Sequence, residues 1–384
     1  MASALTRTRT FAFLLLMLVL AAAFSSAARA QGEPWEMAPP DETVRGLVLE
    51  VEETGETGPS IWGEGGKSMI VEVQITSGTH RGEVVLVEHH LTGNPAYDVE
   101  VSPGDRVLLG VDAVNGQVVN AYITDFAREW SLAVMGAVFL VALLIVGGLK
   151  GLRSVTVLAL TGLAVIFALI PMIISGWNPV LATVLISSLV IGVGLVIVAG
   201  PQKKTLAAIV GTTAGVIIAG VMASLFGSWA HLLGLGSQEA QMLMYAPDLE
   251  LDFRGLLFAG MILGSLGAVM DVGMSIASAV DEVHQANPAL GLHNLVRSGM
   301  NVGRDVLGTM ANTLVLAYAG TSLPLLLLLT IYHTQWSDVI NLDIIATEVI
   351  RALSGSTGLV ICVPVTALVA GLLNRSPGAR AQAN

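Results

Sequence analysis

One carboxylate stands within a stretch that is otherwise typical of a membrane-spanning helix. The stretch GSLGAVMDVGMSIASAV covers residues 264–280 and contains Asp271. A charged Asp near the middle of a bilayer costs roughly 2.5–3.5 kcal/mol on insertion scales, so ionisable residues at that depth are candidates for proton, ion or solute sites. The residue type favours transport chemistry, and a polar contact between helices is the alternative.

Small and polar residues recur with Asp271 on one helical face. Their spacings are four, three, four, four and three for Gly260, Gly264, Gly267, Asp271, Ser275 and Ser278. Glycines on such a face let another helix come close. We therefore predict that Gly260, Gly264 and Gly267 pack against a neighbouring helix and that Asp271 points into the bundle.

A second polar run follows in SGMNVGRDVLGTMANTLVLAYAG, residues 298–320. Arg304, Gly308 and Asn312 are four residues apart and share a face, with Asp305 and Thr309 beside them. An amide without a partner in an apolar medium costs several kcal/mol, so Asn312 needs polar neighbours.

Together the two runs predict one polar site between the fifth and sixth spans. Its expected solute- or ion-binding residues are Asp271, Ser275, Arg304, Asp305, Thr309 and Asn312. Gly308 is expected to help the helices pack, and Arg304 to pair with Asp281, Glu282 or Asp305.

The composition indicates an integral membrane protein attached to an acidic module. Of 384 residues, 54% are hydrophobic and 12% charged, with a mean hydropathy of +0.75 and 42 glycines. Residues 31–129 contain 18 acidic and 5 basic side chains, and the rest is near neutral. The acidic module repels phosphate, so no nucleic-acid partner is expected.

The first thirty residues resemble a secretory signal peptide. Arg7 and Arg9 precede a short apolar run, and Ala28-Arg29-Ala30 gives an A-x-A cleavage pattern. Cleavage after Ala30 is predicted, with an uncleaved signal anchor as the alternative. In either case the following module, residues 31–128, is expected outside the cytoplasm.

Residues 43–125 alternate apolar and polar side chains in five short runs. These runs predict strands at 43–53, 67–76, 83–91, 105–113 and 117–124. Asn115-Gly116 is a hairpin signal, and residues 102–105 form a turn that leads into a strand. Five antiparallel strands with a longer Gly-rich loop predict a small barrel, OB-like or SH3-like.

Long apolar runs between residues 129 and 375 predict a polytopic α-helical bundle of about seven spans. They lie near residues 130–149, 154–174, 179–199, 205–233, 255–280, 306–332 and 352–373, with a kink at Pro324 and a short interfacial helix within 281–302. Lys150, Lys203, Arg297 and Arg375 lie in loops on one side, so that side and the tail, 376–384, are predicted to be cytoplasmic.

The chain resembles the YibE/F-like family of bacterial multi-pass membrane proteins. The resemblance is carried by GSLGAVMDVGMSIASAVDEV, by SGMNVGRDVLGTMANTLVLAYAG, and by a β-module containing PGDRV after a signal segment. It implies a bacterial inner-membrane location and a permease-like description. It supplies no catalytic residues.

Three function classes remain open from the residues alone. The first is a permease of a small solute or ion; the second is a structural role for the polar residues as interhelical hydrogen-bonding partners. The third is a membrane-anchored sensor or scaffold whose barrel binds an extracytoplasmic protein. No enzyme, cofactor or metal site is predicted, because the chain lacks GxSxG, P-loop and spanning His motifs. The lipid bilayer is an expected partner, and homo-oligomerisation is left open.

Overall fold

The structure, a computed structural model, describes residues 42–58, 66–114, 116–246, 250–332 and 335–374. Within these residues the chain forms two compact units that divide at Gly147. The first unit contains the strands and the start of helix α2, and the second contains the helices that follow. The predicted signal segment, 1–30, and the predicted tail, 376–384, lie outside the described residues.

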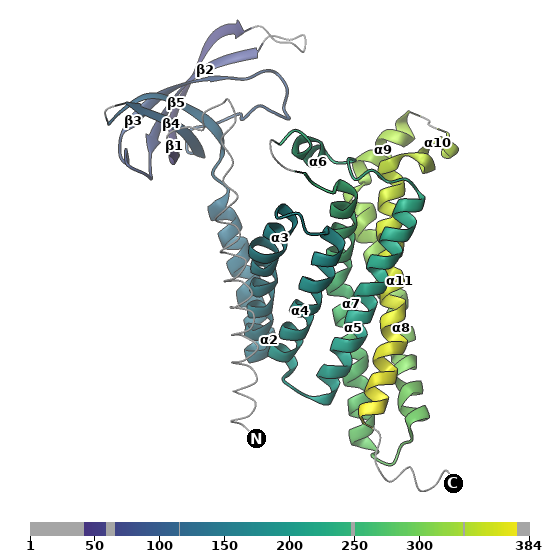
Figure 1. Cartoon of the computed structure of the whole chain (residues 1–384). Coiled ribbons are helices and arrows are strands. Elements are labelled where there is room, and N and C mark those ends of the chain that lie inside the picture. The colour runs from purple at the N-terminus through teal and green to yellow at the C-terminus, as the bar shows by residue number, and fades with distance from the viewer. Residues whose placement is uncertain (1–41, 59–65, 115, 247–249, 333–334, 375–384) are drawn as a thin grey trace. The chain divides into compact units, whose positions relative to one another are not determined.

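Five antiparallel strands form one sheet in the order β3-β2-β1-β4-β5, and β3 also lies against β5 (Figure 1). The strands are β1 (Glu42–Gly58), β2 (Gly66–Ile75), β3 (Val84–His90), β4 (Arg106–Val114) and β5 (Gln117–Phe126). This order and near-closure are those of the five-stranded OB barrel. The predicted OB-like module and its five strands are confirmed.

The barrel core is formed by the inward-facing apolar side chains of strands in which apolar and polar residues alternate. Every second side chain of the three central strands points inward, and the most buried are Val44, Val48, Val71, Val73, Val107, Leu109 and Val111. The predicted turn before β4 is present, because the Asp105 N–H donates to Ser102 O at 3.0 Å and Gly104 has φ 96°. Gly116 has φ 78°, as the hairpin signal requires, while Asn115 lies outside the described residues.

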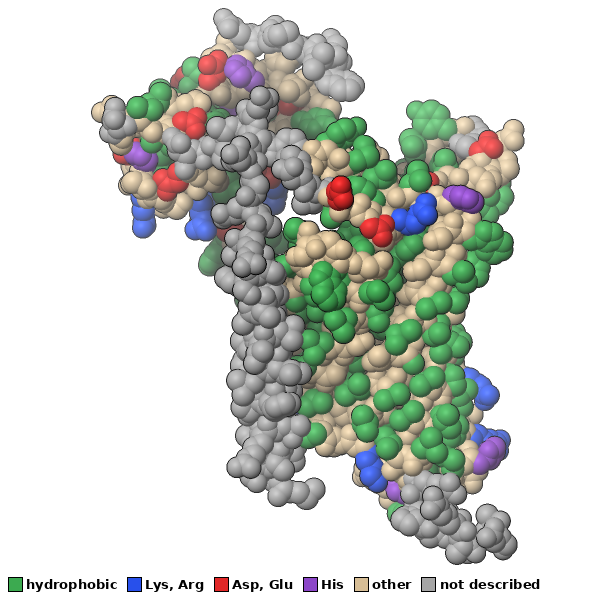
Figure 2. Space-filling view, viewed as in Figure 1, with side chains coloured by type: hydrophobic (Ala, Val, Ile, Leu, Met, Phe, Trp, Pro, Cys, Tyr) green, Lys and Arg blue, Asp and Glu red, His purple; other side chains and the backbone are tan. Residues whose placement is uncertain are grey.

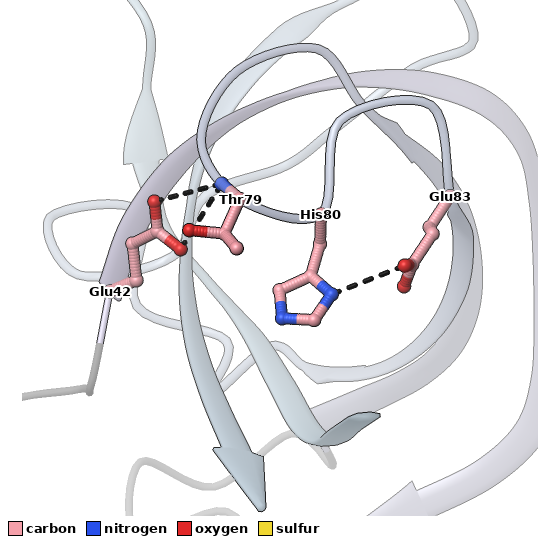
Figure 3. Close-up of polar contacts among 4 residues, drawn as sticks. All are labelled: Glu42, Thr79, His80 and Glu83. Atoms are coloured by element: carbon pink, nitrogen blue, oxygen red, sulfur yellow. Dashed lines mark hydrogen bonds and ion pairs between the residues drawn. The ribbon is translucent and has the colours of Figure 1, made fainter. Parts of the chain in front are cut away.

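Polar contacts hold the loop between β2 and β3 against the start of β1 (Figure 3). The Thr79 N–H donates to Glu42 Oε1 at 3.1 Å, which joins the loop to the first residue of β1. Beside it the His80 ring, only 7% exposed, lies with Nδ1 3.2 Å from Glu83 Oε1. His80 is thus a structural residue of this loop.

A single carboxylate organises the loop after β3. The Thr92 N–H and hydroxyl donate to Asp98 Oδ1 at 2.6 and 2.8 Å, and the Gly93 N–H donates to Asp98 Oδ2 at 2.8 Å. Desolvation opposes ionisation of Asp98, but the hydrogen bonds from Thr92, Gly93 and Asn94 outweigh it and lower the pKa of this carboxyl.

The second unit is a bundle of long helices. Its elements are the later part of α2 (Glu129–Ala164), η1 (Val165–Leu169), α3 (Ile170–Ile174), α4 (Pro179–Ala199), α5 (Lys203–Trp229), α6 (Gln238–Leu243), α7 (Phe253–Ala286), α8 (Leu292–Thr321), α9 (Leu323–Ile331), α10 (Trp336–Asn341) and α11 (Asp343–Leu373). In Figure 1, α4, α5, α7, α8 and α11 run lengthwise, and α7 contacts each of the other four.

Two long stretches are interrupted where the sequence contains glycine or proline. Gly148 has the non-helical angles φ 53° and ψ −133°, so α2 is two helices joined at this residue. Between α8 and α9 the axis bends by 62°, with Pro324 in the first turn of α9. The predicted kink at Pro324 is confirmed. The predicted separate helix within 281–302 is wrong, because α7 continues to Ala286 and α8 begins at Leu292.

Glycines form the closest helix contact of the bundle, between α5 and α11. A Cβ added to Gly215 would lie 2.8 Å from the carbonyl oxygen of Gly358, and one added to Gly358 would lie 2.5 Å from that of Gly215. Branched side chains of α7 fill the adjacent hollows: Val269 lies against Gly215, and Ile262 against Gly220. Small residues on α5 and α11 thus accept large residues from α7.

Five helical stretches in the described residues are long and apolar enough to cross a membrane, or six if α8 and α9 count as one bent span. The first stretch has 46 residues. It would be about 69 Å long as one helix, against a hydrocarbon core of about 30 Å. Gly148 interrupts this stretch, so it can form two shorter helices; the prediction of about seven spans stands beside five or six candidate helices. Figure 2 shows the charged side chains near the two ends of the helical unit and hydrophobic ones between them.

We expect Asp98→Asn to lower the thermal midpoint of barrel unfolding at pH 7, because an amide accepts the Thr92 and Gly93 hydrogen bonds more weakly. The folded pKa of Asp98 lies below its ordinary value of 3.8, so this stabilisation is fully present above pH 3.8 and is lost as the pH falls through the folded value. Near-ultraviolet circular dichroism of the full-length protein in detergent measures the midpoint.

The exposed Glu100→Gln is the matched control and should leave the midpoint unchanged. A difference between wild type and Asp98→Asn that does not shrink as the pH is lowered from 7 through the acid range would contradict the assignment.

Candidate functional site

Asp271 lies on the exposed face of α7, together with the glycines predicted to pack. Gly260, Gly264, Gly267, Asp271 and Ser275 are all exposed, whereas the apolar side of α7, including Val269 and Ile276, is fully buried. Asp271 is predicted to point into the bundle, and it faces a cavity lined by α2, α4 and α7, not a packed helix interface. The physical reason is that branched side chains of α7 provide the contact area against α5 and α11, so the glycine face turns outward.

The packing role predicted for the four glycines is confirmed only at Gly264. A Cβ added there would lie 2.6 Å from the Tyr318 hydroxyl of α8. At Gly260, Gly267 and Gly308 an added Cβ would meet no atom of the described residues within 4 Å. The close helix contacts of the bundle use other glycines, among them Gly215 and Gly358.

A cavity of about 430 Å³ lies beside Asp271, between α2, α4 and α7. Its walls are mostly apolar, with Val157 and Leu158 from α2, Val190 from α4 and Met270 from α7. Among its lining residues Asp271 is the one that ionises, and Ser154 and Thr161 supply hydroxyls that donate to carbonyls of their own helix. The cavity lies between Asp271 and the helices α4 and α2 (its later part), whereas the sequence predicts α8 as the neighbour of Asp271.

Contacts between helices place Asp271 near the middle of the span. Asp281, ten residues later on α7, forms an ion pair with Lys204 at the first turn of α5, with 3.5 Å between Nζ and Oδ2. This pair marks one charged end of the unit. Asp271 lies about 15 Å further along the helix, roughly half the thickness of a hydrocarbon core.

The predicted residues of α8 lie on its exposed side and do not contact Asp271. Arg304, Asp305, Thr309 and Asn312 are exposed, and no hydrogen bond or ion pair joins them to α7 among the described residues. Thr309 donates to Val306 O at 2.9 Å, and Arg304 donates to Asn301 Oδ1 at 3.3 Å. Of the three predicted partners of Arg304, Asp281 pairs with Lys204 instead, and no ion pair joins Arg304 to Glu282 or Asp305 within the described residues. The residues predicted to form one site between the fifth and sixth spans therefore lie in two separate groups, one on α7 and one on α8.

A second polar cluster, which the sequence reading missed, lies at the other end of the bundle. Glu348 and Arg351, one turn apart on α11, form an ion pair of 3.1 Å with side chains 19% and 27% exposed. The Arg351 guanidinium lies 5.9 Å from the centre of the Tyr318 ring on α8. The pair was missed because the seventh span was predicted to begin at residue 352, whereas α11 begins at Asp343. The Glu-x-x-Arg spacing ahead of an apolar run was the available signal.

The Glu348–Arg351 pair lines a cavity of about 330 Å³ between α6, α7 and α11. Three buried polar atoms of the cluster have no hydrogen-bond partner among the described residues: Glu348 Oε2, Arg351 Nε and the Tyr318 hydroxyl. Gly260 of α7 lines the same cavity, together with the apolar side chains of Leu256, Leu257 and Ile344. The wall of this partly apolar hollow therefore contains both a carboxylate and a guanidinium.

The two cavities differ in what they can do. The first has one carboxylate in apolar walls and can take up a proton or a cation. The second has a balanced pair, a carboxylate that accepts and a guanidinium that donates charge-assisted hydrogen bonds. Among the described residues there is no group of three or more His, Cys, Asp or Glu side chains that could hold a metal ion.

Comparison with known families matches both units of the chain. The model described as YibE/F-like protein matches residues 135–376, and the one described as YibE/F family N-terminal domain matches residues 48–126. Neither the curated proteins nor the solved structures contain a significant match. The larger match covers more than half of the 384 residues and confirms the resemblance seen in the sequence. The chain is therefore an integral, multi-pass membrane protein that belongs to the YibE/F-like family.

Proposed function

We propose that the chain is a permease that moves a small solute or ion, with Asp271 as its coupling carboxylate. One observation carries the proposal: Asp271 is the ionisable lining residue of a 430 Å³ cavity formed by three helices. Ionisable residues at this depth are costly and mark ion or solute pathways when they face a cavity.

The surroundings of Asp271 support a coupling role. The apolar walls from α2 and α4 provide no basic partner for the carboxylate among the lining residues. A carboxylate in such a place is stabilised when a proton or cation binds to it. Binding of that ion would change the charge of the cavity, which is how a carrier can link ion movement to solute movement.

The orientation we propose puts the acidic barrel outside the cytoplasm. Lys203 and Lys204 lie where α5 begins, and Arg297 lies near the start of α8, at the same end as the Lys204–Asp281 pair. Asp252 and Asp343 lie at the opposite end, where α7 and α11 begin. Basic residues favour the cytoplasmic side, and an odd number of spans then places the amino-terminal module outside.

We expect Asp271→Asn to abolish solute accumulation driven by a pH gradient while leaving gradient-independent exchange. Asn keeps the size of the side chain but cannot bind and release the coupling proton. The measurement is uptake of radiolabelled amino acids, short carboxylates and divalent cations into proteoliposomes, with and without an imposed gradient. Glu282→Gln, an exposed carboxylate near the end of the same helix, is the control.

Asp271→Glu should retain part of the coupled uptake, because it keeps the carboxylate. The proposal fails if Asp271→Asn accumulates the solute as wild type does, or if no solute in the panel crosses faster than in protein-free vesicles.

One observation favours a second function, in which the barrel binds a protein partner. A hollow of about 480 Å³ on β1, β2 and β3 is lined by Thr54, Ser68, Ile70, Leu86 and Glu88. Leu86 is 73% exposed there, and this face of OB barrels is the one that binds ligands. Its acidic surroundings favour a partner with basic and apolar residues.

Under this second function, Leu86→Glu should remove capture of the partner because it places a charge in the hollow. Val119→Glu on β5 is the matched control, since Val119 is 68% exposed on another strand. Cross-linking in native membranes followed by affinity purification of the full-length chain measures capture. Equal recovery of cross-linked protein from both variants and wild type would count against a partner at this face.

A further inference from the structure

We propose that the cavity beside Glu348 and Arg351 binds a small zwitterion that carries an ammonium and a carboxylate close together on an apolar body. The inference deepens the permease proposal, because it names the class of solute that would be carried. The observations behind the binding site are those of the cavity and its lining residues.

The charged groups in the wall define what the ligand must offer. Glu348 and Arg351 both line the cavity and remain 19% and 27% exposed. A carboxylate accepts hydrogen bonds and a guanidinium donates them. A ligand that fits must present both a donor and an acceptor.

The charge balance of the pair excludes a ligand with net charge. Glu348 and Arg351 neutralise each other at 3.1 Å. An added anion or cation would leave one charge unbalanced in a site that is only partly exposed, which is costly at low dielectric. A zwitterion keeps the site neutral, with its carboxylate on Arg351 and its ammonium on Glu348.

The remaining walls set the shape of the ligand. Leu256, Leu257 and Ile344 line the cavity and offer an apolar surface for a hydrocarbon side chain. Gly234, Gly236 and Gly260 leave room beside them, within a volume of about 330 Å³. That volume lies at the small end of the range for ligand pockets. The Tyr318 ring beneath the Arg351 guanidinium holds this side chain in place and acts as a positioning residue.

The test uses L-leucine and two analogues that each lack one charge, 4-methylpentanoate and 3-methylbutylamine. Isothermal titration calorimetry of the full-length protein in nanodiscs measures their affinities. We expect L-leucine to bind at least about tenfold more tightly than either analogue, because each analogue leaves one charged hydrogen bond unmade. Equal binding of an analogue, or no binding of L-leucine, would overturn the proposal; the second result would mean that water alone fills the cavity.

Two variants connect the binding to these side chains. Glu348→Gln removes the ammonium partner, and Arg351→Lys keeps the charge but removes the planar set of guanidinium N–H donors. Both should weaken L-leucine binding by about tenfold. Glu239→Gln, an exposed carboxylate on α6 at the same end, should not weaken it. The thermal midpoint of each variant is measured alongside, so that loss of fold is told apart from loss of the site.

Failure of this site and failure of the permease proposal give different results. Binding of L-leucine without flux in proteoliposomes retains the site and rejects transport. Coupled flux of another solute that is unchanged in Glu348→Gln retains transport and rejects the site.

A separate observation concerns the outer face of α8. Its packed side carries Leu295, Gly299, Gly303 and Leu314, while the opposite side carries the exposed residues Asn301, Arg304, Asp305, Gly308 and Asn312, followed by the apolar Val315 and Leu316. On a spanning helix, the side that faces lipid is expected to be apolar. The polar side therefore requires a polar cover.

Helix contacts place this polar face well inside the membrane. Gly299 lies against Val280 of α7, close to the charged end marked by Asp281 and Lys204. Asn312 is thirteen residues further along, or about 20 Å. Lipid chains cannot hydrogen-bond its amide at that depth.

We infer that a second copy of this chain covers the face. All copies insert in the same direction, so a two-fold axis along the membrane normal brings α8 against its equivalent in parallel, with each residue at the depth of its own counterpart. The residues are self-complementary in that arrangement. An Asn amide both donates and accepts, and the adjacent opposite charges of Arg304 and Asp305 can pair across the axis. Gly308, open to the outside, permits close approach.

Oxidative cross-linking in native membranes tests this interface. The sole native cysteine, Cys362, is buried, so it adds little background. Gly308→Cys should give a disulfide-linked dimer, whereas Ile217→Cys, exposed on α5 at a comparable distance into the span, should not. Asn312→Leu added to Gly308→Cys should reduce the dimer yield. A yield from Gly308→Cys no higher than from Ile217→Cys would reject the inference.

Discussion

The contact of α5 with α11 at Gly215 and Gly358 determines how the rest of the helical unit is arranged. Two backbones that meet without intervening side chains leave hollows on either side, and Val269 and Ile262 of α7 fill them. Because α7 uses its branched residues for this purpose, its glycine and carboxylate face turns away from the interface. That face then borders the cavity with α2 and α4, and Asp271 lies in its wall. The position of the carboxylate thus follows from packing on the other side of the same helix.

The bilayer adds a second constraint, because hydrocarbon offers no hydrogen bonds. In the described part of the bundle, most hydroxyls satisfy it locally, as Thr161 and Thr309 do by donating to carbonyls of their own helix. Within the described residues no hydrogen bond joins the side chain of Asp271 or Asn312 to a neighbour, and Glu348 Oε2 and Arg351 Nε have no partner. The proposals above assign an ion, a solute or another chain to these places. The family match shows the family and assigns none of these roles.

Much of this architecture could be predicted from the sequence, because it depends on local patterns. Alternation gave the five strands, and apolar length gave α4 at its observed bounds, 179–199. Pro324 marked the bend before α9. The sidedness of α7 could not be predicted, since glycine at spacing four is equally suited to a packed interface and to a cavity wall. Only the partners of Val269 and Ile276 decide between them, and these partners lie on helices far away in sequence. Arg351 and Glu348 were missed for a related reason: their burial depends on Tyr318 and α6.

The division of the chain at Gly147 has a consequence for the barrel as a separable part. The compact unit that contains the strands extends through Val146, and Arg45 of β1 forms an ion pair with Glu129 at the start of α2. The barrel is therefore built together with its own anchor. Proteolytic release or genetic excision just after Phe126 would cut through a folded body instead of a linker. It would also leave Arg45 without its carboxylate. The excised barrel is thus a poor substitute for the anchored one, and the two should be treated as different molecules in any search for what the barrel binds.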